Sequence, residues 1–82
     1  MDKTYRLQAD IAVAMEQELI DLQTFRWKEI EEMLENAKKL GDLSENAEYE
    51  FAKAEQEKCL ERINNIKHIL THAVIIDASE QE

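Results

Sequence analysis

Two acidic residues three positions apart, Asp42 and Glu45, follow the only glycine of the 82-residue chain, Gly41. Carboxylate oxygens are the hard ligands that Mg²⁺ prefers, so this pair at an exposed turn could reach a metal ion or a substrate. The same spacing also fits a helix-capping box, in which Asp42 accepts a backbone amide hydrogen bond and Glu45 folds back toward the cap. The residues alone leave both interpretations open.

Basic side chains flank the acidic pair, although the chain as a whole is acidic. The nearest ones on either side are Lys38, Lys39, Lys53 and Lys58. On helices they could form solvated ion pairs with Glu35, Glu55 and Glu57, each contributing a few tenths of a kcal/mol. A lysine ammonium could equally bind a phosphate as a point charge, without the bidentate geometry of arginine.

Other side chains that could bind a metal or react lie in the second half of the chain. His68 and His72 are four residues apart, which is a possible zinc-binding spacing, but no further ligands converge on them and we interpret them as surface histidines. The single Cys59 cannot form an internal disulfide. Its apolar register predicts a small buried side chain in a reducing compartment.

Two long helical patterns must position the acidic pair. Apolar residues recur in steps of three and four before Gly41, and more regularly after it. The first stripe is Ile11, Met15, Leu19, Leu22, Arg26, Ile30, Met33, Leu34, Ala37 and Leu40, and the second is Tyr49, Ala52, Gln56, Cys59, Ile63, Ile66, Leu70 and Ala73. Gly41 predicts the end of the first helix, because a residue without a Cβ enters the left-handed conformation at little cost.

A short turn makes the two stripes face each other, which predicts an all-α protein: a long antiparallel two-helix coiled-coil hairpin over residues 1–73, with a tip loop at 41–45. The first helix would begin near Tyr5 or Leu7, after a polar lead-in. The run 74–77 predicts a short extended segment at the C-terminus, followed by a disordered tail to residue 82. Arms of ~30 residues would be roughly 45 Å long.

The first stripe has one irregularity. Four-residue steps from Leu22 to Arg26 and on to Ile30 break a strict heptad, which predicts a local relaxation of the supercoil. Phe25 and Trp27 flank this break. We interpret these aromatic residues as packing groups, for the base of the hairpin or for a neighbour, rather than as a platform for stacking bases.

Composition narrows the classes of function. Nineteen acidic against ten basic residues give a net charge of −9, which argues against nonspecific binding to nucleic acid and favours a partner with a basic entrance. No stretch approaches the ~20 apolar residues that cross a bilayer, so we expect a cytoplasmic protein without a membrane partner. A chain this short is not expected to enclose an active-site cavity of its own.

The run from Gly41 to Tyr49, Gly-Asp-Leu-Ser-Glu-Asn-Ala-Glu-Tyr, resembles the tip motif of the bacterial transcript cleavage factors GreA and GreB. The resemblance extends over nearly the whole chain. Further residues at the family's spacing are Glu18, Leu19, Leu22, Arg26, Glu29, Ile30, Ala37, Lys38, Ala52, Lys53, Gln56, Arg62, Ile63, Ile66, Leu70, Ala73 and the run 74–77.

This resemblance implies a transcription elongation factor that enters the secondary channel of a backtracked bacterial RNA polymerase. Such a factor stimulates the polymerase's own cleavage of RNA and is not itself an enzyme. Asp42 and Glu45 would help to hold a second Mg²⁺ and a water in the polymerase active site, without binding the ion alone. Lys38 and Lys53 match positions that contact the displaced 3′ end of the nascent RNA.

The family also carries a C-terminal FKBP-like domain, which is absent from this sequence. We therefore expect weak docking to polymerase and allow for weak self-association. Two alternatives stay open, namely an inhibitor that enters the channel and an inert structural coiled-coil fragment. Gln8 and Ile11 stand where the family usually has Thr and Gly, and Lys28 where it often has Pro, which predicts a more continuous first helix.

Overall fold

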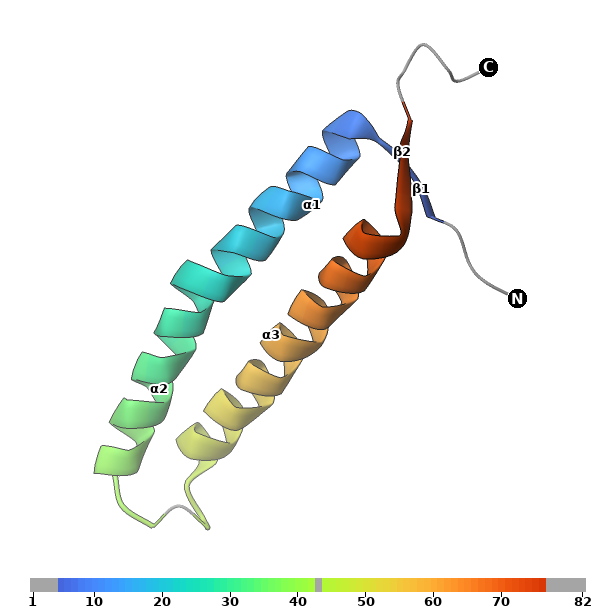
Figure 1. Cartoon of the computed structure of the whole chain (residues 1–82). Coiled ribbons are helices and arrows are strands. Elements are labelled where there is room, and N and C mark those ends of the chain that lie inside the picture. Colours follow the sequence, from blue (N-terminus) through green and yellow to red (C-terminus); the bar gives the residue numbers. More distant parts are fainter. Residues whose placement is uncertain (1–4, 43, 77–82) are drawn as a thin grey trace.

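The protein forms a long, narrow helical hairpin. The computed structural model describes residues 5–42 and 44–76. Its elements are β1 (Tyr5–Gln8), α1 (Ala9–Asp21), the π-helical segment η1 (Leu22–Arg26), α2 (Trp27–Lys39), α3 (Ala47–His72) and β2 (Ala73–Ile76). In Figure 1, α1, η1 and α2 make one continuous arm, and α3 runs back beside it. The molecule measures 58 × 28 × 16 Å.

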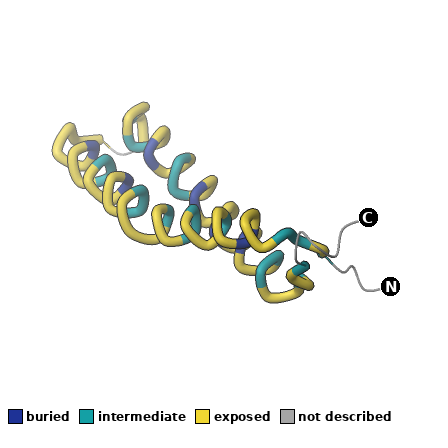
Figure 2. Tube along the Cα trace, turned by 90° about the horizontal axis from the view of Figure 1, so that it is seen from above, coloured by how far each residue is buried: buried dark blue, intermediate teal, exposed yellow. Residues whose placement is uncertain are grey.

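The predicted apolar stripes face each other between the arms. Every position of the second stripe is buried or half-buried, which confirms that prediction. In the first stripe Ile30 and Ala37 are buried, but Ile11 and Leu40 at its two ends are exposed. Ala12 is buried in place of Ile11, because the inward face of α1 continues from Leu22 in steps of three and four. Figure 2 shows buried positions recurring along both arms while their outer faces are exposed.

The best-packed part of the seam lies midway along the hairpin. Ile30, Cys59 and Ile63 form a buried cluster. The partly buried residues packed against it are Leu19, Leu22, Trp27, Met33 and Leu34. Cys59 is buried, as predicted, and burial raises the pKa of its thiol. Of the two aromatic residues, Trp27 packs against this core, whereas Phe25 is 74% exposed.

The break in the first stripe coincides with the π-helical segment η1. The Trp27 N–H donates to the Leu22 carbonyl, five residues back. The Cys59 Sγ lies 3.7 Å from the same oxygen, so the thiol of the opposite arm also donates to this carbonyl. Thr24 Oγ1 donates to the Ile20 carbonyl at 2.6 Å. The arm is therefore continuous, as predicted, but it is not uniformly α-helical.

A small two-stranded sheet at the base adds to the predicted helical hairpin. Residues Tyr5–Gln8, expected as a lead-in and first helical turn, form strand β1 instead, and helix α1 begins at Ala9. Strand β1 pairs in parallel with β2, with Tyr5 opposite Ala73 and Gln8 opposite Ile76. The predicted C-terminal extended segment is present as β2, while Asp77 and the predicted tail lie outside the described residues.

Two ion pairs between described residues cross from one arm to the other. Arg62 donates from Nε and Nη2 to the two carboxylate oxygens of Glu18, at 2.8 and 2.9 Å. Arg26 Nη2 lies 2.7 Å from Glu55 Oε1, which belongs to the opposite arm. The hydrogen bonds from Arg62 lower the pKa of Glu18, and those from Lys58 and Arg26 lower the pKa of Glu55.

Polar groups remain at the surface throughout the described ranges. No polar or charged residue within them is buried. Helices long and apolar enough to cross a bilayer are likewise lacking from residues 5–42 and 44–76.

Candidate functional site

The two acids lie together at the end of the hairpin remote from the sheet. The connection between α2 and α3 runs from residue 40 to residue 46, at the end of the hairpin away from β1 and β2 (Figure 1). Asp42 and Glu45 are both exposed within it. They line one open depression of about 450 Å³. The other lining residues are Leu40, Asn46, Ala47 and Glu48. The structure thus presents both predicted carboxylates on one small surface.

Gly41 ends the first arm, as predicted. Its φ is +100°, a backbone conformation that residues with a Cβ rarely adopt. The Leu40 N–H donates to the Ala37 carbonyl at 3.0 Å, and the Gly41 N–H donates to the Lys38 carbonyl at 3.3 Å. A Cβ added to Gly41 would meet nothing within 4 Å, so the glycine serves the backbone conformation and not close packing.

The predicted capping box is wrong. Helix α3 begins at Ala47, and its N-cap is Asn46, whose Oδ1 accepts a hydrogen bond from the Tyr49 N–H at 3.0 Å. Asp42 Oδ1 instead accepts from Ser44, from its N–H at 3.2 Å and its hydroxyl at 2.8 Å. Asp42 lies too far before the helix to cap it, and it closes a local turn. Neither carboxylate is therefore used to cap helix α3.

Asn46 is the residue of the tip that sequence reasoning missed. Besides capping α3, its Nδ2 donates to the Ala37 carbonyl in the last turns of α2 at 2.7 Å. One side chain thereby joins the ends of both helices. Its position before Ala47, with Glu48 and Glu50 in the first turn, is itself a good N-terminal signal. The Asp42 and Glu45 spacing obscured that signal.

Three of the four nearby lysines are available for a ligand. Lys38 and Lys39 end α2, and Lys53 lies on α3 with its Nζ 3.2 Å from Gln56 Oε1. All three are exposed, and none of the ion pairs formed within the described ranges includes them. Lys58 pairs with Glu55 at 2.9 Å, so the ion-pair interpretation holds for this lysine alone.

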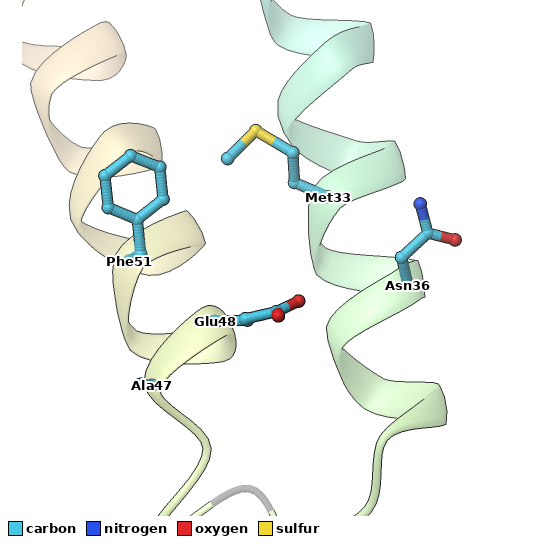
Figure 3. Close-up of a pocket in the computed structure, with 5 residues that line it drawn as sticks. All are labelled: Met33, Asn36, Ala47, Glu48 and Phe51. Atoms are coloured by element: carbon cyan, nitrogen blue, oxygen red, sulfur yellow. The ribbon is translucent and has the colours of Figure 1, made fainter.

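A shallow apolar hollow lies behind the tip. It has a volume of about 380 Å³ and is lined by Met33 and Asn36 of α2 and by Ala47, Glu48 and Phe51 of α3. Figure 3 shows the Met33 and Phe51 side chains approaching each other across the two helices. Phe51 is 58% exposed, so this hollow presents an aromatic side chain to solvent.

The two histidines lie at the opposite end, beside the sheet. Both are exposed, as predicted. His72 Nδ1 is 2.8 Å from the His68 carbonyl oxygen, and the two rings are 4.2 Å apart between centroids. The Tyr5 ring meets His68 edge-on at 5.9 Å. Among the described residues, no group of three or more His, Cys, Asp or Glu side chains is placed to hold a metal ion.

The tip acids suit a shared metal ion better than a resident one. Both are exposed oxygen donors, and no ion pair within the described ranges neutralises them. Two carboxylates would leave most of an octahedral Mg²⁺ shell to water. The arrangement can therefore complete a site whose other ligands a partner supplies.

Comparison with known proteins identifies the protein family of this chain. The family described as "Transcription elongation factor, N-terminal", of GreA and GreB, matches residues 8–75, which include both arms and the tip. The chain belongs to this family.

Curated relatives agree with the family match. The chain is 43% identical over 79 residues to transcription elongation factor GreA 2 of Lactiplantibacillus plantarum, covering 96% of this chain and 49% of the relative. It is 45% identical over 76 residues to GreA of Limosilactobacillus fermentum, covering 93% and 48%. With GreA of Bacillus cereus it shares 40% identity over 81 residues, covering 99% and 51%. The chain thus spans about half the length of the curated relatives it matches.

Proposed function

We propose that this chain is a transcription elongation module whose tip enters the secondary channel of a backtracked RNA polymerase and stimulates cleavage of the RNA. Membership of the GreA/GreB family supports the link to transcription elongation. The observation that carries the proposal is the exposed acidic pair at the end of a hairpin 58 Å long and 16 Å across its thinnest dimension. A narrow rod delivers carboxylates where a globular domain would not fit.

In this proposal Asp42 and Glu45 supply oxygen ligands for a second Mg²⁺ at the polymerase active site and accept a hydrogen bond from the attacking water. Such an ion, when bound, would supply Lewis-acid stabilisation and would make that water easier to deprotonate. Asp42 keeps its side chain oriented through the two hydrogen bonds from Ser44. Because the remaining ligands belong to the polymerase, the chain alone is expected to hydrolyse no RNA.

Lys38 and Lys53 are proposed to contact the displaced 3′ end of the RNA. Both are exposed and lie outside the ion pairs formed within the described ranges. A phosphate contact adds a favourable charge interaction that salt weakens. We expect Lys38→Gln and Lys53→Gln to raise the concentration of the chain needed for cleavage, more strongly at low than at high salt.

The deciding experiment measures RNA release from purified, backtracked RNA polymerase at increasing concentrations of the 82-residue chain. Wild type is compared with Asp42→Ala, Glu45→Ala and the control Glu48→Ala, which removes an acid lining the same depression. We expect release with wild type and Glu48→Ala, and a loss of at least about a hundredfold with the two tip variants.

Two other outcomes would contradict the proposal. Slower intrinsic cleavage in the presence of wild type would indicate the alternative role of a channel-entering inhibitor. No effect at any concentration, with the helices confirmed by circular dichroism, would indicate an inert stalk.

A further inference from the structure

We infer that Asn46 is a positioning residue, which holds the acidic tip in its working geometry by tying the end of α2 to the start of α3. This inference rests on the proposed function of Asp42 and Glu45. Asn46 is adjacent to Glu45 and half-buried, in contrast to both exposed acids.

The oxygen and the nitrogen of the single Asn46 side-chain amide make different contacts. Its Oδ1 accepts from the Tyr49 N–H at 3.0 Å, within α3, and its Nδ2 donates to the Ala37 carbonyl at 2.7 Å, within α2. The Asn46 carbonyl in turn accepts from the Glu50 N–H at 3.0 Å. The residue thus fixes the start of α3 and its distance from α2 together.

The hydrogen bonds of Asp42, Ser44 and Glu45 that the structure describes are local to the turn. Ser44 bonds to Asp42 Oδ1, and the Glu45 N–H reaches the Asp42 carbonyl only at 3.4 Å. Both partners of each of these hydrogen bonds lie within the turn, so the bonds do not attach the turn to a helix. At the Gly41 end, the attachment is the backbone hydrogen bond to Lys38. Within the described residues, Asn46 is the only side chain of the 40–46 connection that hydrogen-bonds to α2.

Loss of this tie should affect chemistry more than folding. Carboxylates that must reach a shared ion need a defined position, and a displacement of about 1 Å can lower a rate about a hundredfold. Folding depends mainly on the buried seam, which lies away from the tip. A positioning role therefore predicts a lower maximal rate with little change in the concentration that gives half of it.

Asn46→Asp separates the two tasks. Aspartate is as good an N-cap as asparagine, so the acceptor for Tyr49 is kept, but a carboxylate has no donor for the Ala37 carbonyl. Asn46→Ser makes a comparable change without added charge, since serine also caps helices and its side chain is shorter. Asn36→Asp is the matched control, because Asn36 is exposed on α2 behind the tip and acquires the same charge.

The experiment uses RNA release from backtracked polymerase with each 82-residue variant, together with ¹⁵N relaxation of the free chain. We expect Asn46→Asp and Asn46→Ser to lower the maximal rate about tenfold or more, with the half-saturating concentration within about twofold of wild type. The order parameters of the Gly41, Ser44 and Glu45 amides should fall, while the Tyr49 amide stays protected from exchange. Asn36→Asp should match wild type in each measurement.

Wild-type rates in both Asn46 variants, with Asp42→Ala inactive, would overturn the inference and leave the proposed function standing. If wild type itself releases no RNA, the proposed function fails instead, and the relaxation data decide whether Asn46 holds the tip. Unchanged order parameters at Gly41, Ser44 and Glu45 in Asn46→Asp would then refute the tie.

Discussion

The middle of the hairpin and its tip are held in different ways. In the middle, buried apolar side chains such as Ile30 and Ile63 meet across the seam, and Arg62 and Glu18 form a bidentate pair between the arms. At the tip, backbone and amide hydrogen bonds shape the chain around Gly41 and Asn46, and the acids stay in solvent. Stability thus resides mainly in the seam, and the proposed chemistry resides in the tip.

The largest expected effect tests the seam. Ile30→Ala removes a fully buried side chain and should lower the free energy of unfolding by about 2–5 kcal/mol, through lost burial and the cavity left behind. Urea unfolding followed by circular dichroism measures this change. Ile20→Ala is the control, because Ile20 is 52% exposed and should lose less than about 1 kcal/mol. Equal losses at the two positions would contradict the assigned seam.

A smaller effect is expected from the backbone of the tip. Gly41→Ala should lower the free energy of unfolding by about 1 kcal/mol, because φ is +100° there and alanine rarely adopts such a conformation. Gly41→Asn should lose less, since asparagine tolerates positive φ. Thermal unfolding of both variants checks this order. If alanine were as well tolerated as asparagine, the turn would have another conformation in solution.

The ion pair between Arg62 and Glu18 gives a smaller, pH-dependent effect. Arg62 lowers the pKa of Glu18 in the folded chain, so the pair contributes fully above the ordinary carboxyl pKa of about 4.3 and is lost as the pH falls through the lowered folded pKa. Glu18→Gln should lower the free energy of unfolding by less than about 1 kcal/mol at pH 7 and make its decline in acid shallower. Urea unfolding at several pH values measures both.

Glu16→Gln is the control for this pair. Glu16 is exposed on the same helix, and the ion pairs within the described ranges do not include it. It should reproduce the wild-type dependence on pH. A decline in acid as steep in Glu18→Gln as in wild type would assign the pH dependence to other carboxylates.

The smallest expected change in stability is at the acid itself. Asp42→Asn keeps an oxygen that can accept from Ser44, and Asn46 caps α3, so the free energy of unfolding should change by less than about 0.5 kcal/mol. RNA release should nevertheless be lost. Thermal unfolding measures the stability of Asp42→Asn, and the cleavage assay measures its RNA release. A loss of 1 kcal/mol or more would mean that Asp42 supports the fold as a cap does.

The helical arms could be predicted because their signals are local. Steps of three and four residues place Ala52, Ile63 and Ile66 on one face, and all three are buried. The glycine stop at residue 41 is equally local. The start of the first stripe was harder to predict, because Ile11 and Ala12 both continue the pattern and side-chain size favoured the wrong one.

The first strand and the position of the N-cap of α3 were not predicted correctly. Strand β1 is defined by its pairing with β2 at the other end of the sequence, and the alternation of apolar and polar residues over Tyr5–Gln8 is too short to be distinguished from the start of a helix. Two residues of the tip could cap the following helix, Asp42 and Asn46. The spacing of Asp42 and Glu45 favoured the first, whereas the N-cap in the structure is Asn46. The identity of the acidic pair came from the residues, but its proposed chemistry came from family resemblance.

The π-helical segment determines how α1 is rotated about the helix axis relative to α2, and therefore which of its side chains face α3. A π turn accommodates one residue more than an α turn, and each α-helical residue rotates the chain by about 100°. Deleting the exposed Gln23 would permit a uniform α-helix, but Ala12 and Glu18 would then turn away from α3 by about that angle. The number of residues between 22 and 26 is therefore under structural constraint, even where the side chains themselves are free to vary.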